Sequence, residues 1–228
     1  MKRVLICFFF CWPLLVLAGN TTLSFEEGKH FQRADLSVIS HDLVQEYVNR
    51  SPNKVHVIEF FSYGCHWCYS LDPLVEAWLK TKPEFVSFER IPIAFQPGWQ
   101  PLAKVFFSAE ILGVTEKVHA KLFSAIQGRK LAGKNGEEFT TLFDEIGVPP
   151  TLFLGTYNSF SVQNKFNWGN GLARAYKITA IPMIVVQGPS GTFFTGVHFA
   201  GSESILLQVV NYLIKQEHLA LLKQKKTT

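Results

Sequence analysis

The sequence is poor in cysteine, with four in 228 residues. Only Cys65 and Cys68 lie beyond the N-terminal region, and no second C-x-x-C pair follows them. A Cys₄ zinc site needs two such pairs, and a Cys₂His₂ site needs two closely spaced histidines after the cysteines. Because the sequence has neither, we expect no metal site at this pair.

Charge of one sign is also scarce. The formal net charge is +4, from 22 lysines and arginines against 18 aspartates and glutamates. Removal of an N-terminal leader containing Lys2 and Arg3 would leave 20 against 18, and thus a net charge of +2. A balance this close to neutral gives no reason to expect nucleic acid or a charged lipid surface as a partner.

Long apolar runs are absent except at the N-terminus. There, residues 4–17 are apolar apart from one proline, and they follow a basic start and precede two small residues. The run is shorter than the roughly 20 residues of a membrane span, so we interpret residues 1–19 as a secretory signal peptide, with a retained anchor as the alternative. Cleavage would remove Cys7 and Cys11, so no other disulfide would compete with the remaining pair in an oxidising compartment.

The remaining cysteines lie where a strand pattern changes to a helix pattern. Residues 57–61 form a short apolar run that is interrupted only by Glu59, and Gly64 marks the break. From Cys65 onward the helical spacing selects one apolar face, formed by Cys68, Leu71, Leu74, Val75, Trp78 and Leu79. We therefore predict Cys65 at the N-terminus of a helix and Cys68 on its buried face.

This placement favours thiol–disulfide exchange. Unpaired N–H groups and the positive end of the helix dipole favour a thiolate, so we expect a lowered pKa for Cys65. Cys68 should be shielded and unreactive. An exposed nucleophile with a protected resolving partner is the arrangement that exchange requires. A purely structural disulfide is the alternative, although structural bridges usually join distant segments.

The rest of the chain predicts a split α/β fold. Strand patterns cover residues 31–34, 57–61, 85–92, 184–186 and 192–199, the last two forming a hairpin. Helix patterns without intervening strands cover residues 102–112, 118–126, 137–146 and 156–165, and a last amphipathic helix follows Ser202. The order βαβ, helices, ββα predicts a thioredoxin fold with a helical domain inserted between its two halves.

These patterns divide the chain into five parts. In order, they are a signal peptide (1–19), the first part of the thioredoxin domain (20–95), the insert (96–174), the second part (175–222) and a basic tail (223–228). Sites in open α/β sheets lie beyond the carboxyl ends of the strands, which is where Cys65 is expected.

Three features in this order resemble the DsbA family of bacterial periplasmic dithiol oxidases. They are the segment from Glu59 to Cys68, with the sequence EFFSYGCHWC, the helical insert, and Thr179-Ala-Ile-Pro182 entering a strand. The resemblance covers nearly the whole mature chain. It implies that Glu59 is a buried acid that assists proton movement around Cys68.

The resemblance also implies a substrate-binding site. Pro182 is similar to the family's cis-proline, which faces the cysteines, and Ile181 to the residue that offers backbone hydrogen bonds to a substrate peptide. Trp67 is assigned to the same binding site. The chain departs from the family between the cysteines, where His66-Trp67 replaces Pro-His. We assign a catalytic role to His66, since a protonated imidazole would favour the Cys65 thiolate, with an ordinary surface residue as the alternative.

Together these features predict a protein-disulfide oxidoreductase. It would donate the Cys65–Cys68 disulfide to unfolded or folding exported proteins with free thiols, and would need no cofactor beyond that disulfide. The resemblance adds a periplasmic location and reoxidation by a DsbB-like membrane oxidase. The alternatives are a disulfide reductase or isomerase of the same fold, or a peptide-binding chaperone without redox turnover.

The direction of the reaction depends on how acidic Cys65 is. If its pKa were about 4, against about 7 for a thioredoxin thiol, the reduced form would gain about 3.7 kcal/mol at neutral pH. This gain would raise the reduction potential from about −270 to about −190 mV. An enzyme whose reduced form is stabilised in this way is an oxidant, because its disulfide is readily reduced by substrate thiols.

Overall fold

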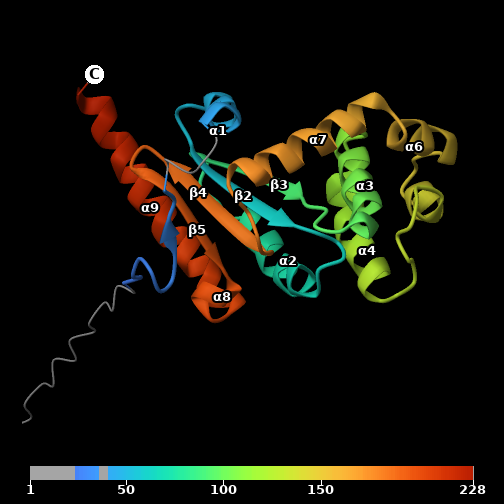
Figure 1. The fold of residues 1–228 in the computed structure, drawn as a ribbon, viewed down its shortest axis with the longest axis horizontal. Helices are drawn as coiled ribbons and strands as arrows, with labels where there is room; N and C mark the ends of the chain where they lie inside the picture. Colours follow the sequence, from blue (N-terminus) through green and yellow to red (C-terminus); the bar gives the residue numbers. More distant parts are fainter. Residues whose placement is uncertain (1–23, 36–40, 228) are drawn as a thin grey trace, which may run out of the picture.

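The computed structural model describes residues 24–35 and 41–227 (Figure 1). The expected signal peptide therefore lies outside the described residues. Within the described part of the chain, no helix combines the length and the apolar character needed to cross a membrane.

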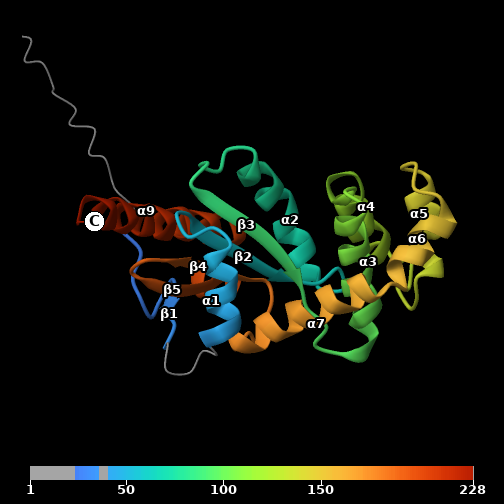
Figure 2. The same ribbon diagram turned by 90° about the horizontal axis from the view of Figure 1, so that it is seen from above.

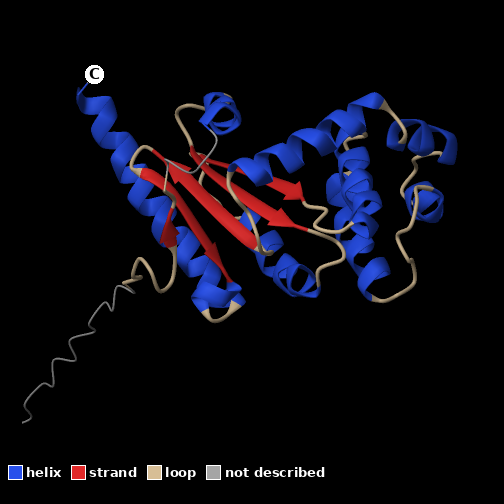
Figure 3. Ribbon diagram, in the orientation of Figure 1, coloured by secondary structure: helices blue, strands red, loops and turns tan. Residues whose placement is uncertain are grey.

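One mixed five-stranded sheet forms the centre of the molecule (Figure 3). Across the sheet the order is β1 (Gln32–Arg33), β5 (Gly191–Gly196), β4 (Met183–Gly188), β2 (Val55–Phe61) and β3 (Val86–Pro92). β2 runs parallel to β3 and antiparallel to β4, and β4 and β5 form the predicted hairpin. The predicted order of βαβ, helices and ββα is confirmed.

Alternate residues of the central strands supply two separate cores. Val57 and Ile184 face α2 (His66–Leu79) and α9 (Glu203–Thr227) on one side of the sheet. Ile58 and Val185 face α1 (His41–Asn49) and α7 (Phe160–Ala175) on the other. Because both faces are covered, every residue of β2 is buried, which explains the nearly continuous apolar run of this strand. Figure 2 shows α2 and α1 on opposite sides of β2 and β3.

Helices fill the chain between β3 and β4. They are α3 (Gln100–Ile111), α4 (Thr115–Gln127), α5 (Thr140–Asp144), α6 (Pro150–Tyr157) and α7, with single 3₁₀ turns at Pro97–Trp99 and Glu137–Phe139. Their aromatic core includes Phe106, Phe123 and Phe153 and is continuous with Phe61 and Cys68 of the thioredoxin half. The helical region therefore packs directly against the cysteine-bearing end of the sheet. The exact domain boundaries remain a prediction.

Several local predictions were wrong. The helix expected over residues 156–165 is divided, because the Ser159 side chain accepts a hydrogen bond from the N–H of Val162 and starts α7. The strand expected over 192–199 ends at Gly196, where a short helix, α8 (Val197–Ala200), begins. Leu74, expected on the apolar face of α2, is 40% exposed. The start of the expected basic tail continues α9, which extends to residue 227.

Candidate active site

Cys65 and Cys68 lie at the start of α2, after the carboxyl end of β2. Cys65 is the N-cap residue with extended backbone angles, and its Sγ accepts a hydrogen bond from the N–H of Cys68 at 3.3 Å. Both cysteines are free thiols; Cys65 is 8% exposed and Cys68 is fully buried. The predicted placement of one sulfur at the helix N-terminus and the other behind it is confirmed.

The two sulfurs differ strongly in proton affinity. A hydrogen bond from the Cys68 side chain, helped by the N–H groups of Cys68 and Trp67, lowers the pKa of Cys65 from 9.0 to about 7, against the opposing effects of burial and Glu59. Burial, and hydrogen bonding to the Cys65 sulfur, raise the pKa of Cys68 far above the usual thiol range. At neutral pH Cys65 is therefore the more readily ionised of the two thiols, and Cys68 stays protonated.

The Ile181–Pro182 bond is cis, as predicted, and lies beside the cysteines. The Cys65 thiol donates to the carbonyl oxygen of Ile181, with the sulfur and oxygen 3.8 Å apart. A cavity of about 240 Å³ adjoins this contact and is lined by Trp67, Ile181, Pro182, Val197 and His198. Val197 and His198 were not predicted as site residues, because α8, which brings them there, was expected to be strand.

His66 and Trp67 form the exposed outer side of the first turn of α2. Trp67 is 59% exposed, and its ring centroid lies 6.0 Å from that of His66. Trp67 reaches the cavity beside Pro182, which agrees with its predicted place at the substrate site. The catalytic role of His66 remains a prediction.

Glu59 is buried in the middle of β2, as the sequence resemblance implied. Its carboxylate accepts a hydrogen bond from Nε of Arg90 on β3 at 2.9 Å. Burial raises the pKa of Glu59 in spite of this ion pair. A buried acid that binds a proton more readily than usual can serve as a proton donor, but the role of Glu59 towards Cys68 remains a prediction.

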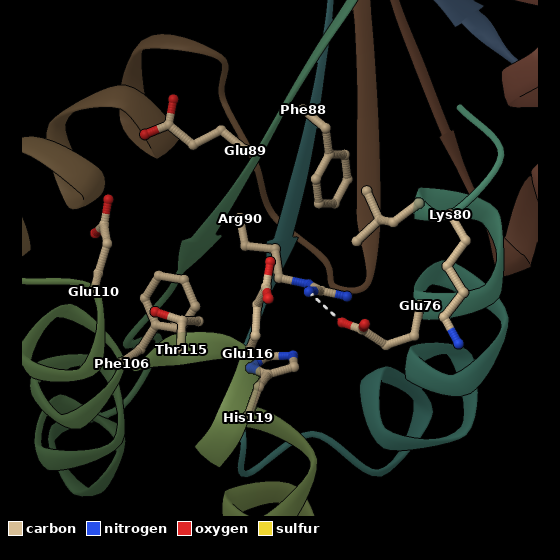
Figure 4. A pocket seen from close by; sticks show the side chains of 11 residues that line it. Glu76, Lys80, Phe88, Glu89, Arg90, Phe106, Glu110, Thr115, Glu116 and His119 are labelled. Atoms are coloured by element: carbon tan, nitrogen blue, oxygen red, sulfur yellow. Dashed lines mark hydrogen bonds and ion pairs between the residues drawn. The ribbon is translucent and has the colours of Figure 1, made fainter. Parts of the chain in front are cut away.

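Arg90 extends this ion pair into a larger cluster that sequence reasoning missed. Its Nη2 donates to Asp72 at 3.1 Å and its Nη1 to Glu76 at 2.7 Å, both on α2. Asp72 also accepts from Nε2 of His119 on α4, at 3.0 Å. Figure 4 shows Arg90, Glu76 and His119 turned toward one another. We call Glu59, Asp72, Glu76, Arg90 and His119 the buried charge cluster; Glu76 forms its outer edge, with a side chain that is 44% exposed.

The sequence contained weak signals for this cluster. Arg90 continues the inward-facing alternation of Val86 and Phe88, and Asp72 follows Cys68 by one helical turn on the buried face. A charged residue in an apolar pattern indicates a buried partner, but the pattern does not say which partner it is.

A divalent cation would find ligand atoms in this cluster. Asp72, Glu76 and His119 each offer one, all within 4.8 Å of one another. Arg90 donates to both carboxylates, however, so the cluster already contains its own cation. We therefore treat it as an electrostatic network.

Helices of the inserted region hold the loop that leads into Cys65. The side-chain amide of Gln127 donates to the carbonyl oxygen of Tyr63 at 2.7 Å. The Trp99 ring covers Gly64 so closely that a Cβ at Gly64 would lie 2.5 Å from its Nε1. Gly64 is therefore required by close packing at this turn.

Comparison with known proteins gives a consistent result, although no family model matches the chain. It is 37% identical over 169 residues to the thiol:disulfide interchange protein DsbA of Burkholderia cepacia, covering 74% of this chain and 78% of that protein. It is 38% identical over 171 residues to DsbA of Azotobacter vinelandii, with the same coverage. A crystal structure of Pseudomonas aeruginosa DsbA superposes with a TM-score of 0.75 at 30% identity, covering 86% of this chain and 96% of that one. The predicted thioredoxin fold is thereby confirmed.

Proposed function

This chain belongs to the DsbA family of thiol:disulfide interchange proteins, and we propose that it donates the Cys65–Cys68 disulfide to exported proteins. Its reaction class, thiol–disulfide exchange, follows from the family. The observation that carries the proposal is the placement of the two sulfurs. Cys65 lies at a helix N-terminus beside the Ile181 carbonyl, with Cys68 fully buried behind it.

The first step is attack by a substrate thiolate on the Cys65 sulfur of the oxidised enzyme. A bond forms between the substrate sulfur and Cys65, the Cys65–Cys68 bond breaks, and its electron pair goes to Cys68. Leaving-group acidity alone would favour attack on Cys68, because Cys65 is then the better leaving group. The substrate thiolate nevertheless attacks Cys65, because Cys68 has no solvent-exposed surface and cannot be reached. A second substrate thiolate then attacks the substrate sulfur of the mixed disulfide, and Cys65 leaves as a thiolate.

The cavity beside Cys65 suits an extended peptide. Its apolar lining of Trp67, Ile181, Pro182 and Val197 would hold a residue next to the substrate cysteine. The backbone of Ile181 would pair with the peptide, as the family resemblance implies. The electrons pass between sulfur atoms, so the proposed reaction needs no cofactor.

Location and recycling complete the proposal. The basic start and apolar run of residues 1–19 support export, and family membership supports the periplasm. A DsbB-like membrane oxidase would recharge the enzyme. In that reaction the Cys65 thiolate attacks a disulfide of the partner, and Cys68 resolves the mixed disulfide.

Trapping of partners tests the roles of the two cysteines. A Cys68→Ser variant cannot resolve the mixed disulfide, so it should accumulate partners covalently bound at Cys65, identifiable by mass spectrometry. The matched Cys65→Ser variant should trap few, because its remaining sulfur is buried. Equal trapping on Cys68 would reverse the assignment of nucleophile and resolver. A chaperone without redox turnover would bind unfolded protein equally well as the wild type and as either variant.

One observation favours a reductase as the second candidate. The Cys65 pKa of about 7 equals the value of about 7 for thioredoxin, a reductant. Ionisation of Cys65 therefore supplies none of the extra stabilisation of the reduced form that a pKa near about 4 would have supplied. Family membership supports the oxidase, and the reduction potential decides between the two.

A further inference from the structure

Opening of the Cys65–Cys68 disulfide requires that a proton be delivered inside the protein. The electron pair of the broken bond goes to Cys68, whose sulfur is fully buried and strongly favours its protonated form. Solvent cannot deliver that proton directly. The Glu59 carboxyl is buried too, its charge acts on both sulfurs, and the family resemblance implies that it assists proton movement around Cys68, so we take it as the donor.

Loss of the Glu59 proton would leave the buried charge cluster unbalanced. Glu59 and Asp72 are both buried, and among the described residues Arg90 is the only cation that forms an ion pair with them, apart from the ionisable His119. With Glu59 protonated, the two buried charges of Asp72 and Arg90 balance each other, and Glu76, whose side chain is 44% exposed, adds a partly solvated negative charge. With Glu59 ionised, two buried carboxylates share one guanidinium, and an uncompensated charge in the interior is costly.

His119 is placed to supply the missing positive charge. In its neutral form Nε2–H donates to Asp72 at 3.0 Å, and Nδ1 accepts from the Tyr63 hydroxyl at 2.7 Å. Burial raises the pKa of Tyr63, so this hydroxyl keeps its proton. When Nδ1 takes a proton, the Tyr63 oxygen can turn to accept it, and the bond to Asp72 becomes an ion pair. His119 can therefore change charge without losing either partner.

Water reaches the cluster from a separate side of the site. A cavity of about 480 Å³ between α2, β3, α3 and α4 is lined by His119, Glu76 and Arg90 (Figure 4). It shares no lining residue with the cavity at Trp67 and Pro182. Protons can thus enter and leave while a substrate peptide covers the cysteines.

Titratable and charged groups face His119 from every element packed against it. The buried ones are Tyr63 before α2, Glu59 on β2, Asp72 on α2 and Arg90 on β3. The other titratable groups lining the cavity are the acids Glu76, Glu89, Glu110 and Glu116 and the base Lys80. Among these groups acids outnumber bases.

We propose that His119 is a positioning residue that keeps the net charge of the buried charge cluster constant during disulfide exchange. When Glu59 gives its proton to the Cys68 sulfur, His119 binds one at Nδ1 from water in the cavity. When Cys68 loses its proton on reoxidation, Glu59 is reprotonated and His119 releases its own. No electron passes through the cluster, and one proton enters for each Cys68 thiol formed. The inference rests on the proposed function, in which Cys68 is the resolving cysteine.

Histidine titration by NMR tests this in the wild-type protein. The ring signals of His119 are followed against pH in the oxidised and in the reduced protein, and assigned with a His119→Gln variant. We expect the titration midpoint to be higher in the reduced protein by about one pH unit or more, because Glu59 is then ionised and the cluster carries more negative charge. Equal midpoints in the two states, or no titration of His119, would overturn the proposal.

Kinetics of the first exchange step give a second, independent test. A reduced peptide is mixed with the oxidised enzyme, and mixed-disulfide formation is measured from about pH 5 to 8, where histidine changes charge. His119→Gln keeps an N–H donor but cannot gain charge, so it should be slower by about tenfold or more and have a flatter pH profile than the wild type. His30→Gln, which changes a histidine near β1, is the matched control and should behave as the wild type. A His119→Gln profile that coincides with the wild type would contradict the proposal.

These outcomes separate the inference from the proposed function. If the oxidised wild-type protein transfers no disulfide to the peptide, the proposed function fails. If it transfers disulfides while His119 titrates alike in both redox states, only the role of His119 fails.

Discussion

Cys65 and Cys68 are one helical turn apart, but their surroundings act on their protons in opposite directions. A hydrogen bond from the Cys68 side chain, helped by the backbone N–H groups at the start of α2, stabilises the Cys65 thiolate, and the apolar interior holds Cys68 as a thiol. The pKa of Cys65 falls only to about 7, not to the value near 4 considered from the sequence, because burial and the Glu59 charge oppose these hydrogen bonds.

This pKa makes the stability of the reduced protein depend on pH. The folded-state pKa of Cys65, about 7, lies below the ordinary value of 9.0, so its contribution is present above pH 9 and is lost as the pH falls through about 7. A pKa shift of about two units corresponds to about 3 kcal/mol of unfolding free energy. The unfolding free energy of the reduced wild type, minus that of Cys65→Ser, should therefore rise by about this amount between about pH 5 and 9 in urea titrations.

Cys68 does not disturb this comparison, because its contribution changes only above the pH range compared. Its raised folded-state pKa stabilises the fold below the ordinary thiol pKa, and this contribution is lost only at higher pH. A difference that stays flat over this range would mean that Cys65 has an ordinary thiol pKa in the folded protein.

Arg90 connects three secondary structure elements through one side chain. From β3 it binds Glu59 on β2 and both Asp72 and Glu76 on α2. Arg90→Met would leave two buried carboxylates without their cation, so we expect a loss of about 3–5 kcal/mol in unfolding free energy. Lys121→Met is the control, because its pair with Glu145 is exposed and should contribute about 0–1 kcal/mol. A loss for Arg90→Met no larger than for the control would mean that the cluster is not energetically coupled.

Element patterns show what the sequence could and could not reveal. Alternation in β2 and helical spacing in α2 are local properties, so the strand–cysteine–helix unit was predictable. The division between α6 and α7 depends on one cap at Ser159, which the continuous helical pattern hides. The pairing of Arg90 with Asp72 and of Asp72 with His119 joins elements far apart in sequence, and no local pattern specifies such partners.

At the scale of the whole molecule, the active site is assembled from both halves of the thioredoxin domain and from the helices between them. Cys65 and Ile181 are 116 positions apart in sequence, yet the sheet order places β4 beside β2 and so brings the two residues into contact. The helices between the halves supply His119 and Gln127 to the loop before Cys65. The cis-proline site could be predicted from the family resemblance, whereas these helix contacts could not, because they depend on how α4 packs.

The reduction potential of the Cys65–Cys68 couple tests the central claim most directly. It is measured by equilibrating the protein in glutathione buffers of known potential and quantifying the two thiols. A disulfide donor of this family should have a potential above about −200 mV, toward the roughly −120 mV that is the reference value for a family member. The Cys65 pKa alone would give a potential near the −270 mV of thioredoxin. A measured potential near that value would identify the protein as a reductase and contradict the account.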